Sequence, residues 1–157
     1  MTLDRRSFIK VLGSASGLAL AGCAAQGPVG STTEIMPKGA TRRVVVVGGG
    51  FGGAIAAKYI RMLDKSIEVV LVEQNRQFIS CPFSNFYIAG LMNDMSTLTI
   101  GYDKLAANHG IKMVYGVATA IDPAAKKVVT TEGTLSYDRL IVSPGIDFRN
   151  EEIEGYT

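Results

Sequence analysis

Two apolar runs and one helical repeat of apolar residues predict the first elements of this chain. Residues 44–47 are four consecutive valines, which leave no polar face and therefore predict a strand buried on both sides. Residues 67–72 form a second apolar run of the same kind. Between the two runs, apolar residues recur at i, i+3, i+4 and i+7, which predicts an amphipathic helix. Its apolar stripe is expected at Ala56, Tyr59, Ile60 and Leu63, and its polar side at Lys58, Arg61 and Lys65.

Later in the chain the apolar runs become shorter. Residues 101–108 predict a short helix ended by Gly110, with the single histidine, His109, as a surface residue near its end. Residues 111–115 predict a third parallel strand. The segments 117–121, 127–131 and 134–137 predict a small antiparallel meander, and residues 140–142 a last apolar strand. Residues 74–100 predict an irregular loop, and a long loop in a compact domain is usually functional.

Glycine residues follow the first predicted strand in the spacing G-x-G-x-x-G. Gly48 would allow the tight turn, Gly50 would let backbone approach a pyrophosphate, and Gly53 would let the helix pack against the strand. Glu73 ends the second predicted strand, where a carboxylate can accept a hydrogen bond from a ribose hydroxyl. The order of strand, glycines, helix, strand and acid favours a dinucleotide-binding unit over a βαβ unit that binds nothing.

Two further segments carry candidate site residues. The last predicted strand ends in Ser143-Pro144-Gly145, which would place exposed backbone beside the glycine loop at the carboxyl edge of the sheet. Within residues 74–100, Cys81 precedes Pro82 among aromatic residues. Free cysteine can behave as a small buried hydrophobe, so Cys81 is either a structural residue or a functional one. As the one cysteine outside the leader region, it cannot form an internal disulfide there.

The first 40 residues predict targeting and a linker. Residues 1–25 contain Arg5 and Arg6 before a short apolar stretch, which is typical of a twin-arginine signal peptide and predicts export to the periplasm. An uncleaved N-terminal anchor is the alternative. Leu20-Ala21-Gly22-Cys23 fits a bacterial lipobox, and Ala19-Leu20-Ala21 fits an ordinary signal peptidase equally well. Membrane association is therefore expected only if Cys23 is lipidated. Residues 26–40 predict a flexible tether rich in Gly, Pro, Ser and Thr.

Charge and length limit the interpretation further. The chain has 16 Lys and Arg against 14 Asp and Glu, and residues 26–157 have 13 of each. This neutral balance gives no electrostatic case for nucleic acid or an anionic membrane as a partner. The sequence shows no cluster of metal ligands and no Ser/His/Asp set.

Residues 41–157 are enough to bury a core. They carry roughly half the elements of a doubly wound sheet, so we expect the N-terminal part of a longer FAD-binding domain.

These motifs together resemble a known family. The glycine loop, Glu73, the meander and Tyr-Asp-Arg-Leu-Ile-Val-Ser-Pro-Gly-Ile at 137–146 resemble the two-dinucleotide-binding-domain flavoproteins, which include the pyridine nucleotide–disulfide oxidoreductases. More narrowly, the twin-arginine leader, Phe-Ile-Ser-Cys-Pro-Phe-Ser-Asn at 78–85 and Ser-Pro-Gly-Ile-Asp-Phe at 143–148 resemble the flavoprotein subunit of flavocytochrome c sulfide dehydrogenase. The resemblance implies an α/β fold: a Rossmann-like FAD-binding domain with a parallel sheet and a small antiparallel β-meander, incomplete at the C-terminus.

The resemblance also implies a site for FAD. Cys81 would be its covalent attachment point, through a thioether to the 8α-methyl group of the flavin. Glu73 would accept a hydrogen bond from the adenosine ribose, with Gln74 next to it, and Val117 would read adenine through its backbone. The residues implied at the diphosphate are Gly48, Gly50, Phe51 and Gly52, with Gly53 behind them, and Pro144 and Gly145 closing over it.

The activity implied is the oxidation of sulfide, with electrons passing through the flavin to a separate c-type cytochrome subunit. The family's redox-active cysteine pair has no counterpart within residues 1–157, so no catalytic residue is assigned and these residues alone are expected to be inactive. Two alternatives stay open. One is a sulfide:quinone or NAD(P)H-dependent FAD oxidoreductase of the same superfamily, and the other is an inert FAD-binding fragment.

Overall fold

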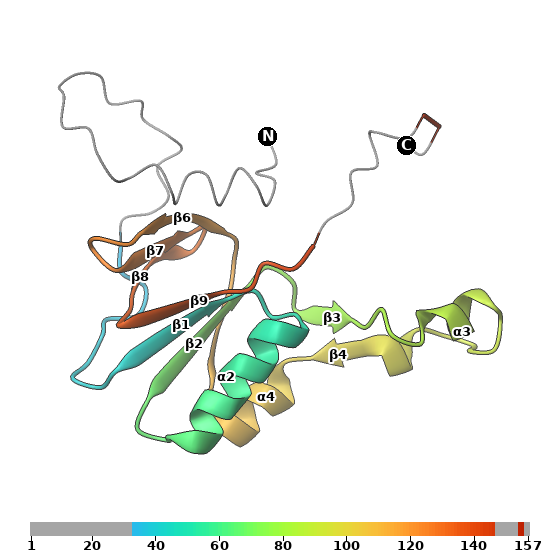
Figure 1. Ribbon diagram of the computed structural model, residues 1–157, viewed down its shortest axis with the longest axis horizontal. Coiled ribbons are helices and arrows are strands. Elements are labelled where there is room, and N and C mark those ends of the chain that lie inside the picture. The colour runs from blue at the N-terminus through green and yellow to red at the C-terminus, as the bar shows by residue number, and fades with distance from the viewer. Residues whose placement is uncertain (1–32, 147–153, 156–157) are drawn as a thin grey trace. The chain divides into compact units, whose positions relative to one another are not determined.

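The computed structural model describes residues 33–146 and 154–155, and the predicted leader with Cys23 lies outside them. Four strands form a parallel sheet in the order β5-β2-β1-β9. Figure 1 labels β2, β1 and β9, which lie side by side in it. Each neighbouring pair in this sheet is parallel. The prediction of a Rossmann-like α/β fold is confirmed. The four strands are β1 (Arg43–Val47), β2 (Glu68–Glu73), β5 (Lys112–Tyr115) and β9 (Arg139–Val142).

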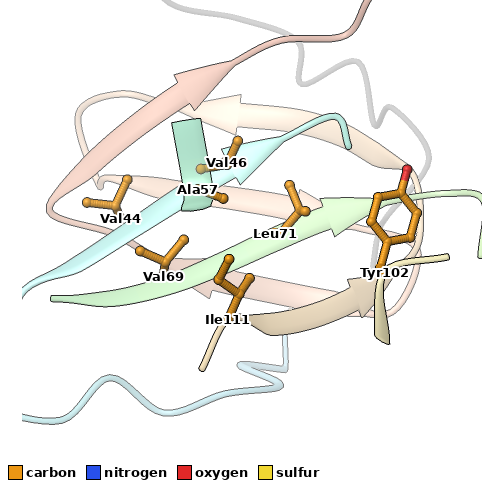
Figure 2. Packing of buried hydrophobic residues seen from close by; sticks show 7 residues of the cluster. All are labelled: Val44, Val46, Ala57, Val69, Leu71, Tyr102 and Ile111. Carbon is orange, nitrogen blue, oxygen red and sulfur yellow. The ribbon is translucent and has the colours of Figure 1, made fainter. Parts of the chain in front are cut away.

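Helices α2 (Phe51–Leu63) and α4 (Asp103–His109) pack beside one face of this sheet (Figure 1). Alternate residues of β1 and β2 point to that face, because successive side chains of a strand point to opposite sides. Helix α4 ends at Gly110, whose φ of 62° suits the predicted glycine cap. The buried cluster on this face consists of Val44, Val46, Ala57, Val69, Leu71, Tyr102 and Ile111 (Figure 2).

The opposite face of the sheet carries the predicted meander. It consists of β6 (Ala118–Asp122), β7 (Lys127–Thr130) and β8 (Gly133–Ser136), paired antiparallel in that order. The intervening valines of β1 and β2 turn to this side and pack with Val128, Leu135 and Tyr137. Helices on one face and the meander on the other explain why the valine run has no polar side.

The expected apolar stripe of α2 is wrong in part, although Ile60 does pack against the buried cluster. Tyr59 and Leu63 are exposed, and the residues that face the sheet are Gly53 and Ala57, with Ile60 partly buried. Small residues at 53 and 57 let the helix approach β1 closely, whereas the larger apolar side chains point outward. The buried side of α2 is rotated from the expected one, and the apolar pattern does not decide between them because α2 has apolar residues on both sides.

Residues 74–100 are more regular than the predicted loop. Strand β3 (Gln77–Ile79) pairs antiparallel with β4 (Thr99–Gly101). Between them lie the short helix α3 (Ser84–Ile88) and a 3₁₀ turn, η1 (Ser96–Leu98). Three-residue strands are too short for a detectable alternation of apolar and polar residues, so this pairing could not be predicted from the pattern.

Residues 33–37, part of the segment predicted as a flexible tether, are bound to the domain. Glu34 forms an isolated parallel bridge with Thr134 beside the meander. The guanidinium group of Arg43, which is 1% exposed, donates to the carbonyl oxygen of Met36 at 2.7 Å. Among the residues that the structure describes, helices are all too short or too polar to cross a membrane.

Candidate functional site

The glycine loop begins where β1 ends, and Gly48 makes the turn. Its φ of +97° is strained for any residue with a side chain. A Cβ atom at this position would also lie 2.0 Å from the carbonyl oxygen of Ser143. The Gly48 N–H donates to the carbonyl oxygen of Val72 at 2.8 Å, which ties the turn to the end of β2.

The rest of the loop leads directly into α2. A Cβ at Gly53 would lie 1.8 Å from the Gly48 carbonyl oxygen, so the helix packs on the turn only because residue 53 is glycine. Gly50 is the N-cap of α2 and offers no side-chain cap. The nearest atom to a Cβ there would be a Phe78 ring carbon at 3.8 Å, which is an ordinary van der Waals contact, so the backbone at Gly50 is not crowded. The first N–H groups of α2 and its dipole therefore face a space that suits an anion.

Glu73 holds its carboxylate beside this loop. One oxygen, Oε2, accepts the Gly49 N–H at 2.6 Å, and the other, Oε1, accepts the Asn75 N–H at 2.9 Å. Both oxygens keep further lone pairs, because each carboxylate oxygen can accept more than one hydrogen bond. A ribose hydroxyl near the loop could therefore bond to Glu73, as the sequence predicts. Gln74 follows as an exposed residue.

The segment after β9 lies next to the glycine loop. The Ser143 N–H donates to the Val47 carbonyl oxygen at 2.8 Å, which continues the pairing of β9 with β1. Pro144 comes close behind, since its Cα would be 3.3 Å from a Cβ at Gly48. Gly145 is exposed and has a φ of +79°. The predicted position of this segment at the loop is confirmed for Ser143 and Pro144.

Cys81 lies on the chain that leaves β3. The ring of Phe78 on β3 meets the ring of Phe51 at the start of α2, with centroids 5.0 Å apart and planes at 77°. Three residues later Cys81 is exposed and free. It starts a turn closed by the Ser84 N–H on the Cys81 carbonyl oxygen at 3.0 Å, with Phe83 at a φ of 69°. An exposed thiol does not fit the alternative of a buried structural cysteine.

Val117 shows a feature that the sequence could not reveal. Its N–H donates to Thr131 Oγ1 at 3.2 Å, and its carbonyl oxygen accepts the Thr131 N–H at 3.0 Å. Both backbone groups predicted to read adenine thus already have a partner within the protein. An adenine N–H could still use the second lone pair of the carbonyl oxygen, while an adenine acceptor would have to displace the long bond to Thr131 Oγ1.

Tyr102 and Gly49 are site residues that the sequence reasoning missed. The Tyr102 hydroxyl donates to the Gly49 carbonyl oxygen at 3.0 Å in a buried position. Burial, the charge of Glu73 and the neighbouring Tyr115 raise the pKa of Tyr102 to about 12, so the phenol keeps its proton at neutral pH. A third glycine inside Gly48-Gly49-Gly50 is the one signal that could have pointed to this contact, because the motif leaves position 49 free.

An open depression lies beside Glu73, and its rim has one cation among aromatic rings. Tyr102 and Tyr115 line it, and the Arg76 guanidinium stacks 4.6 Å from the centroid of the Tyr115 ring. The loop, the free helix N-terminus, the carboxylate and this depression are adjacent at the carboxyl edge of the sheet. Together they fit a dinucleotide, with its diphosphate at the glycine loop and its nucleoside toward Glu73.

Comparison with known proteins identifies a family and related sequences. The family model described as pyridine nucleotide-disulphide oxidoreductase matches residues 42–157. Over 45 residues, 29% of this chain, the sequence is 69% identical to a "Sulfide dehydrogenase [flavocytochrome c] flavoprotein chain" of Chlorobaculum thiosulfatiphilum, and the match covers 94% of that sequence.

Solved structures match over a larger part of the chain. A sulfide:quinone oxidoreductase of Aquifex aeolicus matches with a TM-score of 0.61 and 27% identity, covering 68% of this chain and 25% of its own. A NAD-dependent persulfide reductase of A. fulgidus matches with a TM-score of 0.65 and 27% identity, covering 72% of this chain and 23% of its own. The chain thus spans about a quarter of the length of these structures.

Proposed function

Because the chain belongs to the pyridine nucleotide-disulphide oxidoreductase family, we propose that it is the FAD-binding part of an exported sulfide dehydrogenase. In this proposal electrons pass from sulfide through FAD to a c-type cytochrome subunit. The observation that carries it is the 69% identity to the flavoprotein chain of a flavocytochrome c sulfide dehydrogenase. The exported location rests on the twin-arginine pattern of residues 1–25.

The residues at the carboxyl edge of the sheet would hold the cofactor. Gly48, Gly50 and Gly52 would lie against the diphosphate of FAD, where the uncapped N-terminus of α2 favours negative charge. Glu73 would accept a hydrogen bond from the ribose, and its bond to the Gly49 N–H would hold it in place. When bound, FAD would supply the two-electron chemistry, and the protein would supply binding and orientation.

The flavin end of FAD would lie near Phe51, Pro144 and Cys81. Phe51 is half exposed at the start of α2 and touches Phe78, so it joins the loop to the strand that leads to Cys81. The proposal assigns the exposed Cys81 thiol as the attachment point of the flavin, through a thioether. A covalent link would keep the cofactor on an exported protein that cannot reload it outside the cytoplasm.

A second candidate function is supported by the structural neighbours. The matched enzymes of A. aeolicus and A. fulgidus are named for quinone and NAD as electron partners. In this alternative the same loop binds FAD without a covalent bond, and the electron acceptor or donor is a quinone or a nicotinamide. The state of Cys81 separates the two candidates.

The test is the denatured mass of the intact gene product, followed by peptide mapping around Cys81. We expect an FAD-sized addition on the Cys81 peptide, and its absence from a Cys81→Ser variant. The purified protein, mixed with sulfide and a c-type cytochrome, should also reduce the haem. An unmodified Cys81, with FAD released on denaturation, would exclude covalent attachment and favour the quinone or nicotinamide alternative.

A further inference from the structure

Tyr102 is a core residue whose hydroxyl group reaches the glycine loop. Its side chain is 4% exposed and lies at the edge of the cluster between the sheet and the helices (Figure 2). A phenylalanine ring would fill the same space, so packing does not account for the hydroxyl group. That group donates to the Gly49 carbonyl oxygen at 3.0 Å, across 53 positions of sequence.

Gly49 leaves room for this contact because it has no side chain. A Cβ at position 49 would lie 2.7 Å from the Tyr102 hydroxyl oxygen and 2.9 Å from two ring carbons. Separations below 3.0 Å between such atoms require something to move. The dinucleotide motif itself does not require glycine at its second position. The glycine at 49 is therefore explained by Tyr102, which packs directly on the loop backbone.

Two hydrogen bonds hold the backbone on both sides of Gly49. Glu73 accepts its N–H at 2.6 Å, and Tyr102 donates to its carbonyl oxygen. In a trans peptide the carbonyl and the following N–H point in opposite directions, and the described residues include no cis peptide. With the Gly49 carbonyl held toward the core, the Gly50 N–H must point away from it. That side is the start of α2, where no side chain caps the helix.

We propose that Tyr102 is a positioning residue of the flavin site, which fixes the Gly49–Gly50 peptide so that the Gly50 N–H faces the diphosphate of FAD. The inference rests on the proposed function in one respect, that FAD binds at this loop. Tyr102 does not touch the cofactor and acts through the peptide it holds. Its phenol stays protonated at neutral pH, so this hydrogen bond is present under working conditions.

The test compares ligands that do and do not carry the diphosphate. The intact gene product is prepared with Cys81→Ser so that flavin can exchange, and Tyr102→Phe is added to it. FAD is titrated by its fluorescence, and ADP and adenosine are measured as competitors. Tyr102→Phe removes one hydrogen bond that orients an anion-binding N–H. It should lower the affinity for FAD and ADP about 3- to 10-fold and leave the affinity for adenosine unchanged. Tyr137→Phe is the control, because Tyr137 is buried in the other cluster, away from the loop.

A second variant keeps the test independent of the stability of Tyr102→Phe. Gly49→Ala should also weaken FAD and ADP selectively, because its Cβ displaces the Tyr102 ring. The double variant should lose less than the sum of the two single losses, since both changes break the same contact. Equal losses for ADP and adenosine, unchanged FAD affinity, or additive losses would each overturn the inference. A folded wild-type protein that carries no FAD, neither attached at Cys81 nor released on denaturation, would overturn the proposed function, and this inference with it.

Discussion

At the scale of single residues, Glu73 connects the glycine loop to the chain that leaves β2. Its two oxygens accept backbone N–H groups from Gly49 and Asn75. In Glu73→Gln one of these oxygens becomes an NH₂ group, which faces an N–H and cannot accept it. We expect FAD affinity in the Cys81→Ser background to fall at least about 10-fold, since hydrogen bonds to charged groups contribute about 1.5–3 kcal/mol. Fluorescence titration measures the effect.

The control for this change is Asp122→Asn. Asp122 is an exposed carboxylate at the end of β6, and the asparagine side chain would keep an oxygen that can accept the Ala125 N–H, which Asp122 accepts at 2.8 Å. Its neutralisation alters net charge by the same amount without touching the loop. If both variants lowered FAD affinity equally, a general charge effect would explain the loss, and the role of Glu73 in the site would be wrong.

Arg43 is a buried cation with a full set of partners. Its Nε donates to Glu68 at 2.5 Å, and its other nitrogens donate to the carbonyl oxygens of Met36, Pro37 and Ser136. Arg43→Ala would leave the Glu68 carboxylate and three carbonyl groups without this donor. Removing one partner of a buried ion pair costs about 3–5 kcal/mol, so urea unfolding of the intact gene product should show a loss of that size.

The neighbouring Arg42 provides the matched control. It is 72% exposed and pairs with Asp64 at 3.3 Å. Exposed pairs of this kind contribute about 0–1 kcal/mol, so Arg42→Ala should change the free energy of unfolding by less than about 1 kcal/mol. A similar loss in both variants would contradict the structural role given to Arg43.

The carboxylates that bond to Arg43 predict how the stability of the fold depends on pH. Burial alone would raise the pKa of Glu68, but the hydrogen bonds from Arg43 and Lys112 outweigh burial and lower it below 4.5. The Arg43 backbone N–H and Lys38 lower the pKa of Asp138 below 3.8. A lowered pKa in the folded state adds stability above the ordinary value and removes it as pH falls through the folded value. Urea midpoints should therefore decline below about pH 4.5, and less steeply in Glu68→Gln.

The positions of individual residues could be predicted where a local signal exists. Glu73 was found because it ends an apolar strand at a set distance from the glycines. Arg43 was missed because Arg42-Arg43 looks like a charged, exposed start of a strand, while its partners come from distant segments. Tyr102 was missed for the same reason, since its contact with Gly49 spans 53 positions and follows only from the packing of α4.

At the scale of elements, the packing of α2 on β1 depends on one glycine. Gly53→Ala would bring a Cβ within 1.8 Å of the Gly48 carbonyl oxygen, a backbone atom that cannot rotate away. Overpacking of this kind costs about 1–3 kcal/mol, which outweighs a helix-propensity gain of about 1 kcal/mol. We expect Gly53→Ala to lower the urea midpoint, and to weaken FAD because α2 shifts from the loop.

Gly52→Ala is the companion change on the same helix. There the close atom is Ser143 Oγ at 2.8 Å, the end of a side chain that can rotate. The helix-propensity gain is the same as at position 53, so the stability of the flavin-free protein should hold or rise. Equal destabilisation in both variants would mean that helix packing on the turn is not what Gly53 provides.

The elements also show how far periodicity reaches. Strands β1 and β2 could be predicted because each is a run of apolar residues. Helix α2 could be predicted because apolar residues recur in it with helical spacing. The inward face of α2 was not, because its outer side carries Phe51, Ile55, Tyr59 and Met62, each about half exposed. When both sides of a helix are apolar, the pattern predicts the helix but does not decide which side is buried.

At the scale of the whole molecule, the ends of three parallel strands and the segments that follow them lie together at one edge of the sheet. The ends of β1, β2 and β9 supply the glycine loop, Glu73 and Pro144, while Tyr102 supports the loop from the helix side. A parallel sheet gathers such loops at its carboxyl edge, whatever their distance in sequence. The glycine motif, the strand-ending Glu73 and the Pro-Gly segment could therefore predict where these groups meet, whereas the hydrogen bonds among them could not be predicted.

Delivery of this site to its compartment gives the last prediction, which concerns Arg5 and Arg6 in the leader. If twin-arginine export carries the folded, flavin-loaded protein, then Arg5→Lys with Arg6→Lys should leave a precursor in the cytoplasm that still binds FAD. The loop and Glu73 lie outside the leader, so they form without it. Cell fractionation, intact mass and flavin fluorescence measure this, with Lys10→Arg as a conservative control.

Cys23→Ser should abolish a membrane-bound fraction only if Cys23 is lipidated. Unchanged periplasmic delivery of the double variant would contradict the leader assignment, because lysine keeps the charge and alters only the signal.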